Sequence, residues 1–312
     1  MTTQSGNAQE WLLTHLTPLT QCPLCQSKSW KIKFSLDQLK AYQCISCDLI
    51  FLNPCLFPDA QKMIYSDPHL LSTLNHFLAD YHSEETWNTP ATLTIYRRVV
   101  KQLQQQRPEK GRLLDIGCGK GAFLQEAKKQ GWTCTGLEPN FEASEFLNSH
   151  QIQTIPYDFF DKRLDAEKFD VISLWDLIEH TPDPNAWIAR CKKLLNPGGL
   201  IVMATPNHDS LLDFFSESLF KVSFGKIIFP LKKLYCPEHT LYLTDKTLAD
   251  MLSRNSLTVL SKLQVCTDLS RYTMSFPFRM AATFMLFVSR LLKWENRVIM
   301  IAKSEGMDGS KK

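Results

Sequence analysis

The sequence lacks a recognisable targeting segment, internal repeats and a strong net charge. Its first residues, Met-Thr-Thr-Gln-Ser-Gly-Asn, have neither the basic region nor the apolar core of a signal peptide. No low-complexity tract interrupts the 312 residues, and 44% apolar with 21% charged residues is typical of a globular protein. The 35 basic and 32 acidic residues leave a net charge of +3, which by itself does not indicate a nucleic-acid ligand. We therefore expect a cytoplasmic protein whose ten cysteines are thiols or metal ligands.

A long apolar run is also lacking. The most apolar stretch, residues 280–292, is preceded by Arg279 and interrupted by Arg290, so it falls short of the ~20 residues that cross a bilayer. A buried or amphipathic helix is the favoured interpretation, with contact at a membrane surface as the alternative. No transmembrane span is predicted, and the length accommodates a full α/β domain plus a small extra module.

Two Cys-x-x-Cys knuckles stand near the N-terminus. Cys22 and Cys25 form the first, and Cys44 and Cys47 form the second after eighteen intervening residues. Each knuckle presents two sulfurs from one tight turn, so together they predict a structural Cys₄ zinc site in a small zinc ribbon. A redox Cys-x-x-Cys is the alternative, but the sequence around it lacks a thioredoxin-like strand–helix junction. So small a module has almost no core, and the metal is expected to supply on the order of 10 kcal/mol of its folding energy.

Lysines alternate with aromatic residues between the knuckles: Lys28, Lys31, Lys33 and Lys40 with Trp30, Phe34 and Tyr42. This pattern is compatible with an RNA-contacting face. Aromatic packing beneath solvated lysines explains it as well, and we prefer that interpretation.

A glycine-rich turn is the strongest motif of the chain. The stretch RLLDIGCGKG, residues 112–121, predicts a short buried strand that ends at Asp115, followed by glycines at 117, 119 and 121 and then a helix. Amides at the start of that helix favour an anionic group of a bound ligand. The pattern also fits a dinucleotide fold, but the Asp115 carboxylate would repel a pyrophosphate. S-adenosylmethionine fits better, because its ammonium and sulfonium groups can lie near acidic side chains.

Further acids follow the next strands. Glu138 ends a second strand, where a carboxylate can accept hydrogen bonds from both hydroxyls of a ribose. Asp158 follows a third strand and either bonds the amino group of adenine or is an ordinary turn residue. The strands alternate with helices, which predicts a doubly wound, Rossmann-like α/β sheet. Ligands of such sheets bind at the carboxyl ends of the strands, where Asp115, Glu138, Asp158 and residues 175–180 would converge.

Residues from about 93 to 302 resemble a class I S-adenosylmethionine-dependent methyltransferase. The matching motifs, in the order of that family, are LLDIGCGKGAF, GLEP, FDVISLWDLIEHTPDP, LLNPGGLIVMATPN and PEHTLYLT. The resemblance is to the branch of ubiquinone-pathway and sugar methyltransferases, in which many bacterial members begin with a zinc ribbon that ends in a sequence like FLNP. It implies a seven-stranded sheet with an antiparallel last strand. It also implies that Gly117, Gly119, Glu138 and Asp158 hold the cofactor and that Leu177 or Trp175 lies under it. Asp115 and Gly121 of the glycine turn complete the set of candidate cofactor residues.

The resemblance also suggests a second metal. Ubiquinone-type O-methyltransferases carry an E-x-x-E-H motif that binds a divalent ion, and this chain has Asp176, Glu179 and His180 at the corresponding positions. Two carboxylates and an imidazole can ligate such an ion. The same dipeptide, however, occurs in metal-independent relatives.

The expected organisation is an N-terminal segment (1–20), the zinc ribbon (21–56), a helical connector or lid (57–92) and the methyltransferase domain (93–312). An insertion at 210–240 would cap the substrate. Tyr65, Tyr81 and His82 in the connector either cover the cofactor cleft or pack against it.

His180 and His239 are the candidates for removing a proton from the methyl acceptor. The acceptor is expected to be a small molecule, a sugar or another metabolite. Two alternatives stay open: methylation of ribosomal RNA recognised through the zinc ribbon, and a non-catalytic cofactor-binding scaffold.

Overall fold

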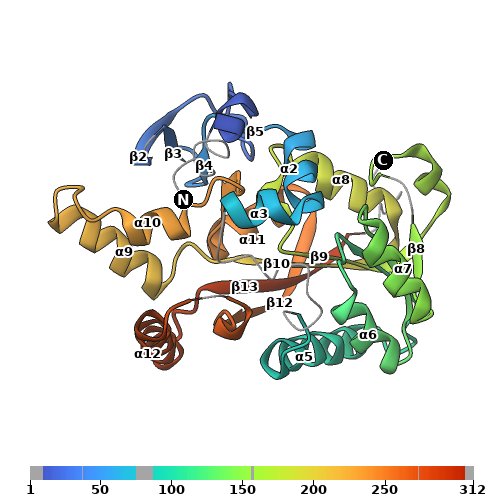
Figure 1. Ribbon diagram of the computed structural model, residues 1–312. Helices are drawn as coiled ribbons and strands as arrows, with labels where there is room; N and C mark the ends of the chain where they lie inside the picture. Colours follow the sequence, from blue (N-terminus) through green and yellow to red (C-terminus); the bar gives the residue numbers. More distant parts are fainter. Residues whose placement is uncertain (1–9, 37, 75–86, 156–157, 273, 306–312) are drawn as a thin grey trace.

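The computed structural model describes residues 10–36, 38–74, 87–155, 158–272 and 274–305 (Figure 1). Its main element is a seven-stranded sheet with the order β12-β13-β10-β9-β6-β7-β8. The strands are β6 (Arg112–Ile116), β7 (Thr133–Leu137), β8 (Gln153–Ile155), β9 (Phe169–Trp175), β10 (Leu195–Pro206), β12 (Leu257–Val265) and β13 (Arg297–Ser304). The strands β10, β9, β6, β7 and β8 are parallel neighbours, whereas β13 runs antiparallel to both β10 and β12. The predicted α/β fold class, including its antiparallel last strand, is confirmed.

Apolar side chains on both faces of this sheet explain the two helical layers. In β6, Leu114 and Ile116 point into one core and Leu113 into the other, as the two-residue period of a strand requires. The first core includes residues of α8 (Pro184–Leu194) and α11 (Asp245–Arg254), and the second includes residues of α5 (Pro90–Gln106), α6 (Ala122–Lys129) and α7 (Phe141–Ser149). Figure 1 shows α8 and α11 above the sheet and α5 and α6 below it.

The helix α5 begins at Pro90, three residues before position 93, where the methyltransferase domain was expected to start. Pro90 occupies its first turn, where a missing amide costs nothing, and the side chain of Thr89 accepts a hydrogen bond from the Thr92 amide. The proline therefore starts the helix and does not separate it from the connector.

The zinc-ribbon segment shares a sheet with the main domain. Its strands β2 (Trp30–Leu36), β3 (Leu39–Cys44) and β4 (Ile50–Leu52) are joined by β11 (Leu241–Tyr242) in the order β11-β4-β3-β2. Leu241 pairs with Phe51, and the Leu52 amide donates to the Thr240 carbonyl at 2.9 Å. Phe51 also belongs to the same buried core as Leu114 of β6. The expectation of a module almost without a core is therefore wrong, because the main domain provides one.

Several shorter elements complete the chain. The N-terminal strand β1 (Leu16–Thr17) pairs with β5 (Cys55–Leu56), and α2 (Pro58–Ser66) and α3 (Pro68–Leu74) follow. The remaining elements are α9 (Leu211–Val222), α10 (Phe229–Leu234), α12 (Phe276–Leu292) and the 3₁₀ turns η2 (Lys162–Ala166), η3 (Ile178–His180) and η4 (Leu269–Arg271). Tyr81 and His82 lie outside the described residues. In the part of the chain that the structure describes, every helix is too short or too polar to cross a bilayer.

Candidate active site

The glycine turn lies at the carboxyl end of β6, between the ends of its neighbours β7 and β9. The chain leaves β6 toward β7 and later returns on the other side of β6 as β9, so this is the point where the strand order reverses. Asp115 in β6, Glu138 directly after β7 and Trp175 at the end of β9 therefore stand on one edge. The predicted convergence of these residues follows from the topology.

The conformation of the turn requires glycine at two positions. Gly119 has φ +51°, and a Cβ atom built on it would have no neighbouring atom within 4 Å, so open space lies over its backbone. Gly121 has φ +71° and precedes α6, and a Cβ atom there would lie 2.2 Å from Leu147. Open space over bare backbone at the start of a helix suits a ligand that approaches the amides closely. A Cβ atom built on Gly117 would lie 3.3 Å from Leu177, so the side chain of Leu177 lies beside the turn.

Glu138 ties the turn to the second strand. Its two carboxylate oxygens accept hydrogen bonds from the amides of Gly119, at 2.8 Å, and Asn140, at 2.9 Å. Burial raises the pKa of this carboxyl, although both amides act against the rise. A carboxylate has about four lone-pair sites, so two stay available for the hydroxyls of a ribose.

Asp115 is buried beneath the turn. It accepts a hydrogen bond from the Ser173 hydroxyl at 2.6 Å, a partner that the sequence did not reveal. Burial raises the pKa of Asp115 to about 7, and the negative charge of Glu138 adds to that rise. Two acids of this kind favour a cationic ligand, because a positive charge offsets both burial and mutual repulsion.

Two of the predicted cofactor residues, Asp158 and Trp175, contact side chains outside the glycine turn. Asp158 is exposed and forms an ion pair with Lys62 of α2 at 2.5 Å. The Trp175 ring packs against Tyr96 and Phe123, with ring centroids 4.7 and 5.0 Å away. Both residues stay candidates for contact with the adenine of a cofactor. The ion pair between Lys62 and Asp158 joins the connector to this part of the site.

Asp176 does not take part in the predicted divalent-ion site. Its carboxylate pairs with the guanidinium groups of Arg297 in β13 and Arg271 in η4. Arg297 donates a hydrogen bond to this carboxylate and Arg271 adds a second positive charge at 3.8 Å, and a carboxylate neutralised in this way is a poor metal ligand. No residue pattern around Asp176 indicates these partners, which lie 121 and 95 positions away.

His239 takes the place of Asp176 in that group. Ligand atoms of Glu179, His180 and His239 all lie within 4.8 Å of one another, and the imidazole rings of the two histidines meet edge to face at 4.7 Å. Neither carboxylate oxygen of Glu179, nor Nδ1 of His239, has a hydrogen-bond partner among the described residues. Two imidazoles and a carboxylate can accept and donate a proton, and they can also bind a divalent ion.

Hydrogen bonds to the backbone hold this cluster and set the tautomer of His180. Its Nδ1 lies 2.7 Å from the Glu238 carbonyl, which can only accept, so Nδ1 carries the proton. Nε2 therefore keeps its lone pair, toward which the Tyr65 hydroxyl points at 3.3 Å. The Thr240 amide donates to the Glu179 carbonyl at 2.8 Å and fastens the segment after His239 to η3.

The electrostatics of the cluster favour neutral side chains. Burial lowers the pKa of both His180 and His239, and the neighbouring His180, His208 and Arg297 lower that of His239 further. Burial, together with the charge of Asp176, raises the pKa of Glu179 to about 8. Both imidazoles are thus unprotonated near neutral pH, the state in which they accept a proton or bind a metal.

His208 is a further buried histidine near the cluster, and the sequence reading missed it. Its Nδ1 lies 3.0 Å from Asp213, and its ring packs against Tyr235 and Tyr242 at 5.2 and 4.9 Å. The strand-ending motif ATPN directly before it was the signal that could have found it, because polar residues after a strand end face the ligand edge.

The four cysteines of the knuckles come together. Their sulfur atoms all lie within 4.8 Å of one another, with Cys22–Cys47 at 3.6 Å and Cys25–Cys44 at 3.5 Å. A tetrahedral ion with sulfur ligands at about 2.3 Å has an edge of about 3.8 Å, so the donor set fits zinc. Cys55 lies apart from this group and is buried.

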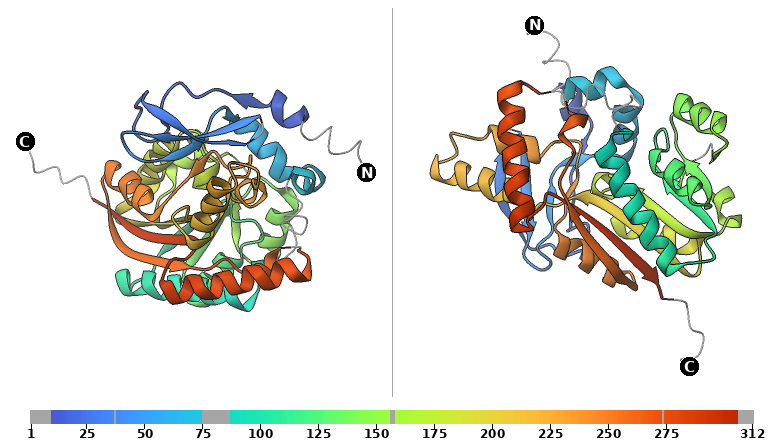
Figure 2. Two further views of the ribbon diagram at one scale, coloured as in Figure 1. Left: turned by 90° about the vertical axis from the view of Figure 1, so that its left-hand side faces the viewer. Right: turned by 90° about the horizontal axis from the view of Figure 1, so that it is seen from below.

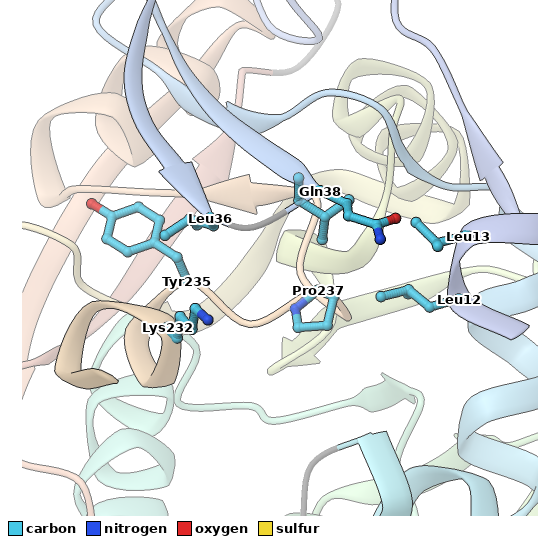
Figure 3. Close-up of a pocket in the computed structure, with 8 residues that line it drawn as sticks. Leu12, Leu13, Leu36, Gln38, Lys232, Tyr235 and Pro237 are labelled. Atoms are coloured by element: carbon cyan, nitrogen blue, oxygen red, sulfur yellow. The ribbon is translucent and has the colours of Figure 1, made fainter. Parts of the chain in front are cut away.

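A hollow of about 140 Å³ opens between the N-terminal segment and the insertion (Figure 3). Leu12 and Leu13 line one side, and Lys232, Tyr235 and Pro237 line the other. None of its lining residues is a candidate cofactor or catalytic residue, so we do not assign the hollow to the active site.

Comparison with known proteins decides the family. The profile of the methyltransferase domain family matches residues 91–262, more than half of the chain. The chain belongs to this family. The match confirms the predicted class I S-adenosylmethionine-dependent methyltransferase, and the zinc ribbon lies outside it.

Curated relatives of this methyltransferase include ubiquinone biosynthesis O-methyltransferases. That of Coxiella burnetii (strain Dugway 5J108-111) is 28% identical over 160 residues, which cover 48% of this chain and 66% of the relative. That of Pasteurella multocida (strain Pm70) is 34% identical over 112 residues, which cover 31% of this chain and 46% of the relative. The chain thus spans less than two thirds of the length of these relatives.

Solved structures with a similar fold include an S-adenosylmethionine-dependent methyltransferase from Archaeoglobus fulgidus. It has a TM-score of 0.49 and 19% identity, covering 74% of this chain and 100% of that one. The 1,6-didemethyltoxoflavin-N1-methyltransferase of Burkholderia thailandensis has a TM-score of 0.49 and 14% identity, covering 88% of this methyltransferase and 99% of that one.

Proposed function

We propose that this protein transfers a methyl group from S-adenosylmethionine to a small-molecule acceptor that lies between the glycine turn and the cluster of Glu179, His180 and His239. The observation that carries the proposal is that one fold contains both an acidic edge suited to the methyl donor and a histidine cluster suited to proton removal. The buried Asp115 and the half-buried Glu138 form an acidic edge beside bare glycine backbone. Neutral imidazoles stand in a cluster whose Glu179 oxygens and His239 Nδ1 have no hydrogen-bond partner among the described residues. Bound S-adenosylmethionine supplies a methyl carbon already activated by its sulfonium.

On the donor side, residues of the chain would bind and orient S-adenosylmethionine. The Glu138 carboxylate would accept hydrogen bonds from the ribose hydroxyls, and amides around Gly119 and Gly121 would meet the ligand's carboxylate. The open space over Gly119 leaves room for this approach. Asp115 would contribute negative charge beneath the turn, which favours the two cationic groups of the ligand.

On the acceptor side, the chain removes a proton. An in-line displacement forms a bond from the acceptor to the methyl carbon, while the electrons of the broken carbon–sulfur bond go to sulfur. The proton of a hydroxyl acceptor would pass to His239, or to Nε2 of His180, which is unprotonated because Nδ1 carries the proton. The hydroxyl of Tyr65, on the connector, would position that lone pair or the acceptor.

A hydroxyl on a metabolite is the acceptor that we favour. The curated relatives are named for O-methylation in ubiquinone biosynthesis, which supports a hydroxyl group in general, and a sugar or glycan precursor is the narrower proposal. Ribosomal RNA is less well supported. Lys33 is paired with Glu217 of α9 at 2.8 Å, and Trp30 and Tyr42 pack on Phe51, so these members of the lysine–aromatic pattern are committed to packing.

A divalent ion and a zinc ion would use different residues. Cys22, Cys25, Cys44 and Cys47 would hold a structural zinc ion, and Glu179, His180 and His239 would hold a divalent ion in the cluster. We assign the second group to proton transfer, because the hydrogen bonds of His180 already explain its orientation.

The deciding experiment follows a labelled methyl group. The purified protein is incubated with methyl-labelled S-adenosylmethionine and, separately, with the aqueous metabolite, lipid and RNA fractions of a bacterial extract. We expect label in a small-molecule fraction and none with the His239→Ala variant. Label in the RNA fraction would support the ribosomal RNA alternative instead. Tight cofactor binding without transfer to any fraction would indicate the non-catalytic scaffold.

A further inference from the structure

The helix α12 exposes apolar side chains where a surface helix normally carries polar ones. Leu286 and Ser289 face the protein, yet the outward positions are Phe276, Met280, Phe284, Phe287 and Leu291. Their spacing of three or four residues places them on one stripe of the helix, and each is more than half exposed. The stripe therefore runs the length of the helix and has no partner among the described residues.

The insertion that contains α9 and α10 continues this apolar surface. The helices α9 and α12 contact each other, and the rings of Phe214 in α9 and Trp294 just after α12 lie 5.3 Å apart. Phe214, Phe215 and Val222 of α9 are exposed, and Phe224 in the turn after it is 93% exposed. Figure 1 shows α9, α10 and α12 together at its left-hand side, and the left panel of Figure 2 views the molecule from that side. We call residues 211–234 and 276–294 the α9–α12 surface.

Basic residues outnumber acidic ones on this surface, whose two acids are the buried Asp213 and the ion-paired Glu217. Four lysines and no acid lie between Glu217 and Glu238, and four basic residues and no acid lie between Asp268 and Glu295. The whole chain has a net charge of only +3, so the excess is concentrated here. Arg271 and Arg279 are engaged by the protein, with Asp176 and with backbone carbonyls, and Lys221 is exposed but pairs with Glu217 of the same helix at 3.6 Å. Arg290, Lys293 and Lys226 are also exposed.

We propose that the α9–α12 surface docks this protein on a membrane that contains anionic lipids. The apolar stripe would enter the region between headgroups and acyl chains, and the exposed Arg290, Lys293, Lys221 and Lys226 would lie among the phosphates. The helix α12 has 17 residues and includes two arginines, so it lies on a bilayer and does not cross it.

A second copy of the chain suits this surface less well. A two-fold symmetric contact would bring the exposed cations of one copy against those of the other, and like charges at an interface repel. The ring of Phe224 at the tip of a turn also projects outward and does not form a flat patch. A projecting aromatic ring inserts readily into a lipid layer, whereas a rigid partner would need a matching pocket.

The docked orientation would place the acceptor side near the lipid. Four residues lie between Leu234, the end of α10, and His239, and Arg271 in η4 joins the segment before α12 to Asp176. The two ends of the α9–α12 surface are thus connected to the neighbourhood of the catalytic cluster. Docking itself does not depend on the proposed function, because it requires neither cofactor nor acceptor.

The test is co-sedimentation of the full-length protein with vesicles of phosphatidylcholine, with or without phosphatidylglycerol. We expect the wild type to sediment with the anionic vesicles. The double variant F284S/F287S should reduce the partition coefficient roughly tenfold or more, since two rings no longer enter the lipid. The variant R290E/K293E should lose the preference for anionic vesicles. The matched control is Phe141→Ser, which changes an exposed phenylalanine on α7, away from this surface, and should bind as the wild type does.

Three results would overturn the proposal. The wild type could stay in solution with both kinds of vesicle, or the F284S/F287S variant could sediment as the wild type does. The third is concentration-dependent dimerisation in analytical ultracentrifugation that F284S/F287S abolishes, which would assign the surface to self-association. All the substituted side chains are exposed, so unchanged thermal unfolding confirms that the variants are folded.

Discussion

The donor edge and the acceptor cluster are built in different ways. The donor edge consists of backbone and acids from two adjacent strands, and Asp115, the glycine turn and Glu138 all lie within 24 consecutive residues. The acceptor cluster draws Glu179 and His180 from η3, His239 from the segment before β11, and Tyr65 from the connector. A local site is recognisable as a motif, whereas the distant parts of the cluster depend on the ribbon and connector that hold them.

The largest expected effect comes from removing a ligand of the zinc ion that we propose for Cys22, Cys25, Cys44 and Cys47. Cys44→Ser should abolish zinc binding and lower the melting temperature strongly, because a structural zinc ion contributes on the order of 10 kcal/mol. Turnover should fall more than cofactor affinity, because β4 of the ribbon pairs with β11, which begins two residues after His239. Metal analysis, thermal unfolding and cofactor titration measure these effects.

Cys266→Ala is the matched control, a buried thiol outside the cysteine cluster, and it should keep its zinc. A Cys44→Ser protein with normal zinc content would disprove the metal assignment. Equal loss of cofactor affinity and turnover would show that the ribbon supports both sites alike.

The second test separates the two sites by function. His239→Ala should lower kcat by roughly 10²–10⁴-fold, the usual contribution of a general base, and leave the Kd of S-adenosylmethionine nearly unchanged. His150→Ala, at an exposed position after α7, is the control and should change neither quantity. A His239→Ala enzyme with normal kcat on its acceptor would remove His239 from the mechanism.

The third test acts on the donor edge alone. Glu138→Gln should weaken cofactor binding by roughly 10- to 150-fold, because a charge-assisted hydrogen bond contributes about 1.5–3 kcal/mol. Isothermal titration measures the change, and Glu142→Gln, an exposed acid nearby in α7, is the control. If saturating cofactor does not restore kcat, then the donor edge and the acceptor cluster are not separable.

The smallest effect is a pH dependence of cofactor affinity. With a pKa of about 7 in the unliganded protein, Asp115 is largely protonated at pH 6 and ionised at pH 8. A cationic ligand favours the ionised form, so affinity should rise over this range by about tenfold or less and level off above it. Asp115→Asn should flatten the profile. A wild-type affinity independent of pH between 6 and 8 would contradict a role for the charge of Asp115.

The fold was largely predictable because its signals are local. The glycine turn, the strand before it and the helix expected at 280–292 follow from local residue patterns, and in the structure that helix spans residues 276–292. The error at Asp176 has a different origin. A motif at one strand end predicts a carboxylate at that place, but not that Arg297 of another strand neutralises it.

The sequence by itself determined the donor edge, because a strand, a left-handed glycine turn and a helix start are properties of neighbouring residues. The tertiary structure alone decided the acceptor side. It joined β11 to the ribbon sheet, brought His239 beside His180 across 59 positions, and turned Asp176 toward two arginines. It also left the stripe of α12 facing outward, although the same residues would serve equally well as a buried helix. The physical reason is that burial and ion pairing depend on which distant surfaces meet, and local residue patterns do not encode that.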